Sequence, residues 1–243
     1  MKTAVIFHGH FRCFDQTWPD TKRNLIDVLD PDIFAFAWTD SMGHHLPPGE
    51  SIDPENHPGY APGDPVSDDY IESVRHRLNP KIFMLDRYSN HDPYFQSLVD
   101  SWRYTTDYLH VPAGNHRPKG CLGMVWSRSQ IIKAVNKYER DHGFQYDLII
   151  VTRYDVYHTI PVDLNNLNLD IVNAHGGPNW HPWDYWTAGP SEGIALWGQQ
   201  WDGMQELIDN NQFNICPHAW QTAWFKHKNI EWCSVELGTG IAR

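Results

Sequence analysis

Short apolar runs that alternate with longer amphipathic segments predict an α/β fold for this chain. We expect a buried strand at residues 3–7, a helix at about 18–29 and a second strand at 33–38. Thr17 stands directly before the expected helix and has a side chain suited to an N-cap. Because a short strand–helix–strand unit returns the chain to the same edge of a sheet, the first two strands are expected to be parallel.

The rest of the chain continues this alternation, and its most apolar run is Leu148-Ile149-Ile150-Val151. Such a run is typical of a strand buried on both faces, near the centre of a sheet. Further helices are expected at residues 68–78, 94–109, 124–141, 201–210 and 219–226. Further strands are expected at residues 82–85, 147–152, 171–174, 193–197 and 230–235. With no internal repeat and no linker, residues 1–243 are expected to form one Rossmann-like domain, in which helices flank a mostly parallel twisted sheet.

Charge and composition argue against some partners. The formal net charge is −11, whereas nucleic acids and anionic membranes require a basic surface. No apolar stretch approaches the roughly 20 residues of a membrane span. Cys13, Cys121, Cys216 and Cys233 lie far apart and are interpreted as reduced thiols, with two disulfides as the alternative. We therefore expect a cytoplasmic protein (in the host cytoplasm if it is viral), with no nucleic-acid partner and no membrane span.

The turn after the first strand is the first candidate ligand site. It reads Gly9-His10-Phe11-Arg12, and ligands of open α/β sheets bind outside the carboxyl ends of the strands. Glycine allows close approach of the backbone to a ligand, and the planar fork of Arg12 suits a phosphate or a base edge. Trp38 and Asp40, at the end of the second strand, are expected beside it. The alternative is an ordinary tight turn with a surface arginine.

The second candidate is Arg153-Tyr154-Asp155, which ends the most apolar strand. A carboxylate there can bind Mg²⁺ or Mn²⁺, and the ion can bridge two phosphate oxygens. Arg153 can contact the same diphosphate or hold the aspartate in place. A structural ion pair is the alternative, and if the carboxylate were buried in a closed pair remote from any cavity, the enzyme interpretation should be abandoned.

Two later segments complete the candidates. Residues 175–192 hold tryptophans, a tyrosine and Asp184, a combination that suits an acceptor-sugar site with Asp184 as general base. A rigid aromatic surface loop is the alternative. His218 precedes an expected helix and can reach a metal or a phosphate, although a lone histidine is more often a cap or a surface residue. No Rossmann glycine fingerprint, P-loop or HExxH zinc motif occurs.

Three segments resemble a family of small GT-A-type glycosyltransferase-like proteins of bacteria, phages and large DNA viruses. They are Ala-Val-Ile-Phe-His-Gly-His-Phe-Arg at residues 4–12, the Pro-Asp-Ile-Phe…Trp strand at 31–38, and Tyr-Asp-Leu-Ile-Ile…Arg-Tyr-Asp at 146–155. The resemblance implies a GT-A fold, with Arg153-Tyr154-Asp155 in the place of the Asp-x-Asp metal motif. Arg153 replaces the first acid of that motif, which puts metal dependence in doubt. His218 loosely matches the late histidine that some GT-A enzymes add as a metal ligand.

The sequence therefore predicts a glycosyltransferase that moves a sugar from a nucleoside-diphosphate sugar to a hydroxyl of a glycan acceptor. The nucleotide sugar would be bound by seven residues: Gly9, His10, Phe11, Arg12, Trp38, Asp40 and Arg153. Asp155, with His218 and Mn²⁺ or Mg²⁺, would stabilise the leaving diphosphate, and Asp184 would be the base. The alternatives are a non-catalytic carbohydrate-binding protein on the same fold and a metal-dependent nucleotidyltransferase or hydrolase.

Overall fold

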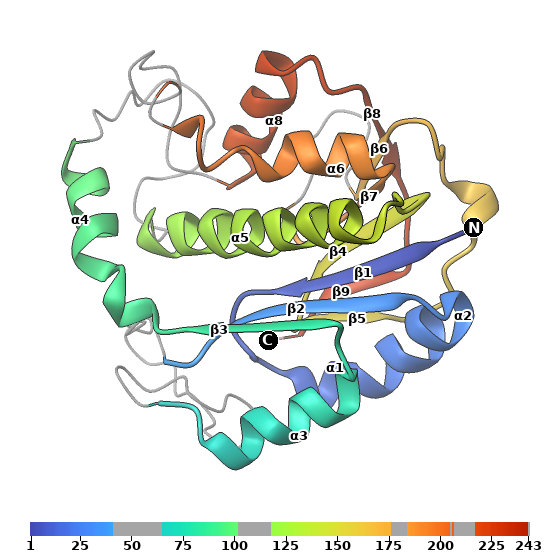
Figure 1. The fold of residues 1–243 in the computed structure, drawn as a ribbon, viewed down its shortest axis with the longest axis horizontal. Helices are drawn as coiled ribbons and strands as arrows, with labels where there is room; N and C mark the ends of the chain where they lie inside the picture. Colours follow the sequence, from blue (N-terminus) through green and yellow to red (C-terminus); the bar gives the residue numbers. More distant parts are fainter. Residues whose placement is uncertain (41–64, 102–117, 176–183, 205, 207–216, 243) are drawn as a thin grey trace.

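A central seven-stranded sheet organises the protein, in the strand order β3-β2-β1-β4-β7-β6-β8 (Figure 1). The computed structural model describes residues 1–40, 65–101, 118–175, 184–204, 206 and 217–242. The strands of this sheet are β1 (Thr3–His8), β2 (Asp32–Trp38), β3 (Ile82–Asp86), β4 (Leu148–Arg153), β6 (Val172–His175), β7 (Trp186–Gly189) and β8 (Trp232–Val235). Only β7 runs against its neighbours, so the sheet is mostly parallel, as expected.

Helices cover both faces of the sheet, which gives three layers (Figure 1). The helices on one face are α1 (Phe14–Thr21), the π-helical turn η1 (Lys22–Ile26), α2 (Asp27–Leu29) and α3 (Asp68–Leu78). Those on the other face are α4 (Asp92–Ser101), α5 (Pro118–His142), α6 (Ser191–Gly198) and α8 (Pro217–His227). Two short 3₁₀ turns, η2 (Tyr88–Asn90) and η3 (Leu164–Asn166), lie in connections.

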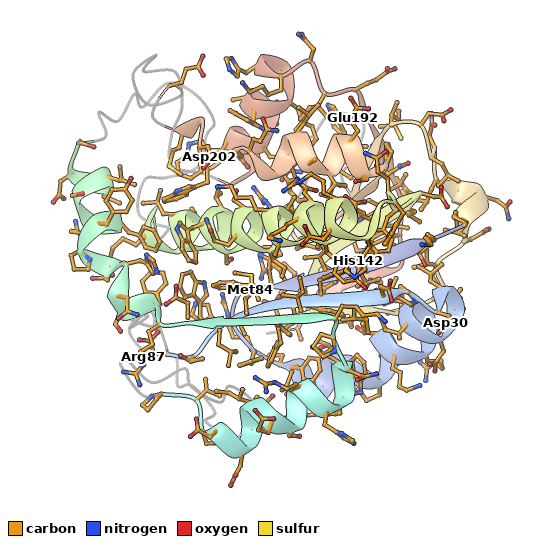
Figure 2. All side chains as sticks on the ribbon, viewed as in Figure 1. Asp30, Met84, Arg87, His142, Glu192 and Asp202 are labelled. Atoms are coloured by element: carbon orange, nitrogen blue, oxygen red, sulfur yellow. The ribbon has the colours of Figure 1, made fainter. Side chains whose placement is uncertain are left out.

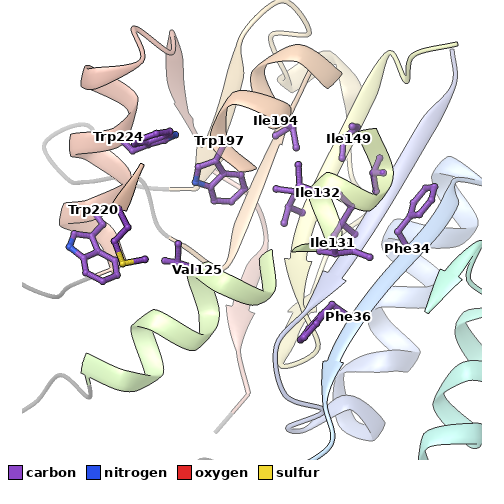
Figure 3. Packing of buried hydrophobic residues seen from close by; sticks show 14 of the residues in the cluster. Phe34, Phe36, Val125, Ile131, Ile132, Ile149, Ile194, Trp197, Trp220 and Trp224 are labelled. Carbon is purple, nitrogen blue, oxygen red and sulfur yellow. The ribbon is translucent and has the colours of Figure 1, made fainter. Parts of the chain in front are cut away.

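Alternating side chains of the strands build two separate cores, one on each face of the sheet (Figure 2). In β1, Ala4 and Ile6 pack toward α5, whereas Val5 and Phe7 pack toward α1. The α5 side is the more aromatic: Figure 3 shows Trp197 of α6 and the tryptophans of α8 packed together with Val125 and Ile132 of α5. Strands that are buried on both faces have continuous apolar runs in their sequence, which explains why β1 and β4 could be predicted.

Most expected elements are confirmed, and two predictions are wrong. Residues 193–197 form part of helix α6 rather than a strand, because Ile194 and Trp197 share one buried helical face. The first helix begins at Phe14, with Cys13 in the left-handed region at its start, so Thr17 lies inside the helix and is not its N-cap. Of the helix expected at 94–109, the structure describes α4 as far as Ser101. Of the helix expected at 201–210, residues 201–203 form a turn, and residues 205 and 207–210 lie outside the described chain.

Three strands of the structure were not expected from the sequence. Strand β7 enters the sheet between β4 and β6. The short strands β5 (Val156–His158) and β9 (Thr239–Ile241) pair antiparallel as a separate two-stranded sheet. That pairing brings the end of the chain beside β4, where Ala242 N–H donates to the carbonyl of Asp155 at 2.8 Å.

Two further expectations concern membranes and disulfides. None of the described helices is both long enough and apolar enough to cross a membrane. Of the described cysteines, Cys13, Cys121 and Cys233 form no disulfide. Cys216 lies outside the described residues.

Candidate functional site

The candidate site lies where the order of the strands changes direction. From β1 the chain adds β2 and then β3 on one side, and it crosses to the other side to add β4. Ligands of open α/β sheets bind at the carboxyl ends of the strands at such a switch point. His8 and Arg153 are register partners at the ends of β1 and β4, so the two sequence candidates meet there. Gly9 makes the turn with φ of +105°, a conformation that favours glycine.

Arg153 and Asp155 form a two-bond ion pair at the end of β4. Arg153 donates from Nε to Oδ1 of Asp155 at 2.9 Å and from Nη2 to Oδ2 at 2.5 Å. The Asp155 side chain is 5% exposed and that of Arg153 is 17% exposed. Thr17 Oγ1 donates to the carbonyl of Tyr154 at 2.6 Å, which fixes the turn between the two charged residues. Arg153 therefore has the more accessible charge of the pair, and Asp155 holds its guanidinium in place.

Electrostatic effects on the two groups agree with this pairing. Burial alone would raise the pKa of Asp155, but the charge and hydrogen bonds of Arg153 and the charge of Arg12 hold it below its usual value. Burial alone would lower the pKa of Arg153, whereas Asp155 and then Asp184 raise it. Both groups stay charged near neutral pH. The charge of Arg12 therefore acts on the same carboxylate as that of Arg153.

Asp184 is the third charged residue of the site. Its Oδ2 lies 3.5 Å from Nη1 of Arg153, and its side chain is 8% exposed. The structure thus brings Asp184 to the end of β4, although the two residues are far apart in the sequence. The neighbouring Tyr185 and Trp186 are buried in the core on the α1 side of the sheet, so neither provides the sugar-stacking surface expected for residues 175–192. Residues 176–183 lie outside the described chain.

Two predicted nucleotide contacts on the β1–α1 turn are packing residues. Phe11 is 1% exposed, and its ring centroid lies 5.1 Å from that of Tyr154. His10 is half-buried and packs beside two rings, at 6.5 Å from Trp38 and 6.2 Å from Tyr88. The rings of Phe11 and His10 therefore pack the turn against the rest of the protein.

The two predicted contacts at the end of β2 also have structural roles. Trp38 is 1% exposed and stacks on Trp126 of α5 at 5.1 Å. Asp40 is buried and accepts hydrogen bonds from the backbone N–H groups of Tyr88 and Ser89 at the start of η2. These bonds tie the end of β2 to the end of β3. Neither side chain presents a surface to a ligand in this structure.

The described residues around Asp155 do not fit a divalent cation. Arg153 occupies both carboxylate oxygens of Asp155, and a cation would have to displace that charge. In the part of the chain that the structure describes, no three His, Cys, Asp or Glu side chains gather as metal ligands. His218 begins α8, but its side chain lies outside the described set. The expected metal contacts of Asp155 and His218 therefore gain no support from this geometry.

The sequence analysis missed a group of buried polar side chains beside the switch point. His8, Ser127 and Arg128 are at most 1% exposed, and His8 Nδ1 lies 3.4 Å from Ser127 Oγ. Burial first, and then the charges of Arg128 and Arg153, lower the pKa of His8 well below its usual value, so this histidine is neutral. The sequence signal for this group was Arg128, a charged residue that stands between Val125 and Ile132 on the apolar face of a helix.

One sequence pattern of hydrolases is also present but lacks the corresponding geometry. Gly189-Pro190-Ser191-Glu192-Gly193 fits the Gly-x-Ser-x-Gly nucleophile pattern, and it joins strand β7 to helix α6. Ser191 Oγ, however, donates to Oε2 of the buried Glu139 at 2.8 Å. Gly189 pairs with Ile149 near the amino end of β4, whereas Arg153 is at the carboxyl end of that strand. Ser191 therefore lies at the opposite end of the strands from the candidate site. Ser191 is therefore a structural residue.

Comparison with known proteins adds nothing to this geometry. No protein-family model matches the chain, and no curated protein matches it in sequence.

Proposed function

We propose that the chain is a glycosyltransferase that moves a sugar from a nucleoside-diphosphate sugar to a glycan hydroxyl, on a single GT-A-like domain. The supporting observation is the position of Arg153: a guanidinium fixed by two hydrogen bonds, at the switch point of a Rossmann-like sheet. A planar cation there suits the diphosphate of a nucleotide sugar, whose negative charge grows as the sugar departs.

In this proposal Arg153 and Arg12 stabilise the leaving diphosphate. Both charges act on Asp155, so they belong to one local field. Asp155 is a positioning residue, because both of its oxygens are bonded to Arg153. A preorganised cation of this kind stabilises developing charge without rearranging during the reaction. No step of the scheme uses a metal ion, since the described donors around Asp155 do not fit one.

Asp184 is the proposed base on the acceptor hydroxyl. Its carboxylate lies 3.5 Å from Nη1 of Arg153, so a base and a leaving-group cation stand on one side of the sheet end. If the reaction inverts the anomeric centre, the acceptor attacks opposite the diphosphate and Asp184 takes the proton of its hydroxyl. Glycan acceptors carry the hydroxyl that Asp184 would deprotonate.

Thermal unfolding with UDP or GDP, each with and without Mn²⁺, tests the binding half of the proposal. A hundredfold excess over the dissociation constant should stabilise the wild-type protein by about 2.7 kcal/mol, with or without Mn²⁺. Arg153→Lys keeps the charge but loses the fork, and should lose most of this stabilisation. Lys133→Met removes a cation from the exposed pair with Asp202 and serves as the control. Equal stabilisation of wild type and Arg153→Lys by either nucleotide would contradict the proposal.

One observation favours a second candidate, a non-catalytic carbohydrate-binding protein on the same fold. Both acids of the site are nearly buried, at 4% exposure for Asp155 and 6% for Asp184, and a catalytic base must reach its substrate. A protein of that kind would bind sugar without turning over any nucleotide sugar. Asp184→Asn separates the two candidates, since it should abolish transfer in an enzyme and leave carbohydrate binding intact in a binding protein.

A further inference from the structure

Arg128 of α5 is a fully buried cation with unfilled hydrogen-bond donors. Its side chain is 1% exposed and reaches from α5 to the Trp197 ring of α6. One nitrogen, Nη2, donates to Oε1 of Gln200, and the guanidinium carbon stands 4.0 Å from the centre of the Trp197 ring. Within the described residues, Nε and Nη1 have no hydrogen-bond partner. A guanidinium offers five donors, and most of these remain unused.

No carboxylate compensates Arg128 at short range within the described residues. Asp184 acts on Arg128 only through its charge, and that carboxylate is already 3.5 Å from Arg153. Burial lowers the pKa of Arg128 to about 9, which Asp184 only partly opposes. Buried charges are normally paired and hydrogen-bonded, because desolvating a charge without partners is costly. A chain that folds with this residue inside must gain something from it.

The surroundings of Arg128 are polar as well. Among the described residues, His8 Nε2 and Gln200 Nε2 are further buried atoms without a hydrogen-bond partner. Ser127 Oγ donates to the carbonyl of Met124 at 3.0 Å, so it accepts from the Nδ1–H of the neutral His8. That tautomer leaves Nε2 of His8 as an acceptor. The group therefore offers hydrogen-bond donors at Arg128 and an acceptor at His8 Nε2. This combination suits an anion that also carries a hydroxyl group.

One side of this group is aromatic. Trp197 lies against the guanidinium, and Figure 3 shows Trp197, Trp220 and Trp224 on the α6 and α8 side of the layer. His8 links this group to the switch point, because the charges of both Arg128 and Arg153 lower its pKa. Arg153 retains 17% exposure and forms the more open side.

We propose that Arg128 is the cation of a small anion-binding site, in which Nε and Nη1 donate to the oxygens of a phosphoryl or carboxylate group. A planar guanidinium matches both groups, and each fills the donors that the protein leaves unmade. The site is separate from the fork of Arg153, whose Nε and Nη2 are bonded to Asp155. It does not depend on sugar transfer, because it needs neither a nucleotide nor an acceptor.

The ¹H–¹⁵Nε spectrum of the arginines tests this site directly in the wild-type protein. Inorganic phosphate and sodium acetate are titrated separately at constant ionic strength, and Arg128→Lys assigns the Arg128 cross-peak. At least one of the two anions should shift this cross-peak along a saturable curve, and the stronger of them identifies the ligand group. A cross-peak that neither anion moves, or that moves linearly as with sodium chloride, would overturn the proposal. The Arg153 cross-peak is a separate reporter, so this result is independent of the proposed transferase.

Unfolding in urea separates a ligand site from a purely structural arginine. Arg128→Met removes a buried charge with unmet donors, so without ligand the variant should be as stable as wild type or more stable. The anion that shifts the cross-peak should stabilise the wild type and leave Arg128→Met unchanged. If Arg128→Met still gained the wild-type stabilisation from that anion, the site would not be at Arg128. If Arg128→Met failed to fold, the same comparison with Arg128→Lys, which loses the Nε donor, would decide.

Discussion

Arg153 donates from two nitrogens to both carboxylate oxygens of Asp155, immediately after the central strand of the sheet. The sequence shows these residues two positions apart but does not show that they face each other. With side-chain exposures of 17% and 5%, the pair is screened little by water. It therefore has a stability role and an orienting role that can be measured separately.

Removing both partners of this pair should cost less than the sum of removing each one alone. Asp155→Ala removes both short hydrogen bonds of Arg153 and leaves Asp184, at 3.5 Å, as its remaining counter-ion, so the free energy of unfolding should fall by about 3 kcal/mol. Arg153→Met with Asp155→Ala removes both charges and should cost clearly less than the sum of the two single changes. Urea unfolding of the four proteins gives the coupling energy. Additive effects would show that the pair contributes nothing in solution.

The same pair predicts a loss of stability in acid. The pKa of Asp155 is lower in the folded protein than in the unfolded chain, where it is about 3.9. Its contribution is therefore fully present above about pH 4 and is lost as the pH falls through the lower folded value. The advantage of wild type over Asp155→Asn should be constant from pH 7 to 5 and should shrink toward pH 3. A difference that stayed constant down to pH 3 would contradict this account.

His158 predicts a second pH dependence, in a higher range. It is 1% exposed in β5, and its Nδ1 lies 3.3 Å from Thr21 Oγ1. Burial lowers its pKa to about 4, against about 6.5 in the unfolded chain. Because the unfolded chain binds the proton more readily, stability should fall by about 3 kcal/mol as the pH drops from 6.5 to 4.

His158→Asn is the matched variant, since its side chain retains a polar atom near Thr21 and does not titrate in this range. Urea unfolding at pH 7, 5.5 and 4 should show a flatter profile for the variant than for wild type. His8 is present in both proteins, so its own titration cancels in the comparison. Parallel profiles would show that His158 is not buried as described.

Glu139 of α5 predicts a graded series of stability losses. It is 4% exposed and accepts from the backbone N–H of Tyr146 at 2.7 Å and from Ser191 Oγ at 2.8 Å. Glu139→Ala leaves a buried N–H without an acceptor and should cost about 2–3 kcal/mol. Ser191→Ala removes one of the two bonds and should cost about 1 kcal/mol, with Glu139→Gln between them. Thermal unfolding gives the order, and a larger loss for Ser191→Ala than for Glu139→Ala would contradict these roles.

The sequence predicts best those elements whose pattern depends on local physics. The parallel pairing of β1 and β2 follows from their apolar runs and the helix between them. Helix α3 was expected at its observed bounds, and in the structure the Ser67 side chain caps it by accepting from Tyr70 N–H. Residues 193–197 were misread because a short apolar run does not distinguish a strand from a buried helix.

The site was predictable only in part, because side-chain pairing depends on long-range packing. The ends of β1 and β4 were located from sequence, and the structure brings Arg12, Arg153, Asp155 and Asp184 into one electrostatic group there. The closed pair between Arg153 and Asp155 was one of two alternatives that the residue types allowed. Arg128 was missed, since its sequence neighbours indicate an apolar helix face and its partner Gln200 lies in a distant segment.

The most direct test of the central claim is the rate at which nucleotide sugars release their nucleoside diphosphate. A panel of nucleotide sugars is incubated with the wild-type protein and with Arg153→Lys, and kcat/KM is measured for the best donor. If Arg153 grips the diphosphate, the wild type should turn over at least one donor, and Arg153→Lys should be slower by about 100-fold or more. Turnover of no donor by the wild type, or a loss smaller than about tenfold in Arg153→Lys, would contradict the claim.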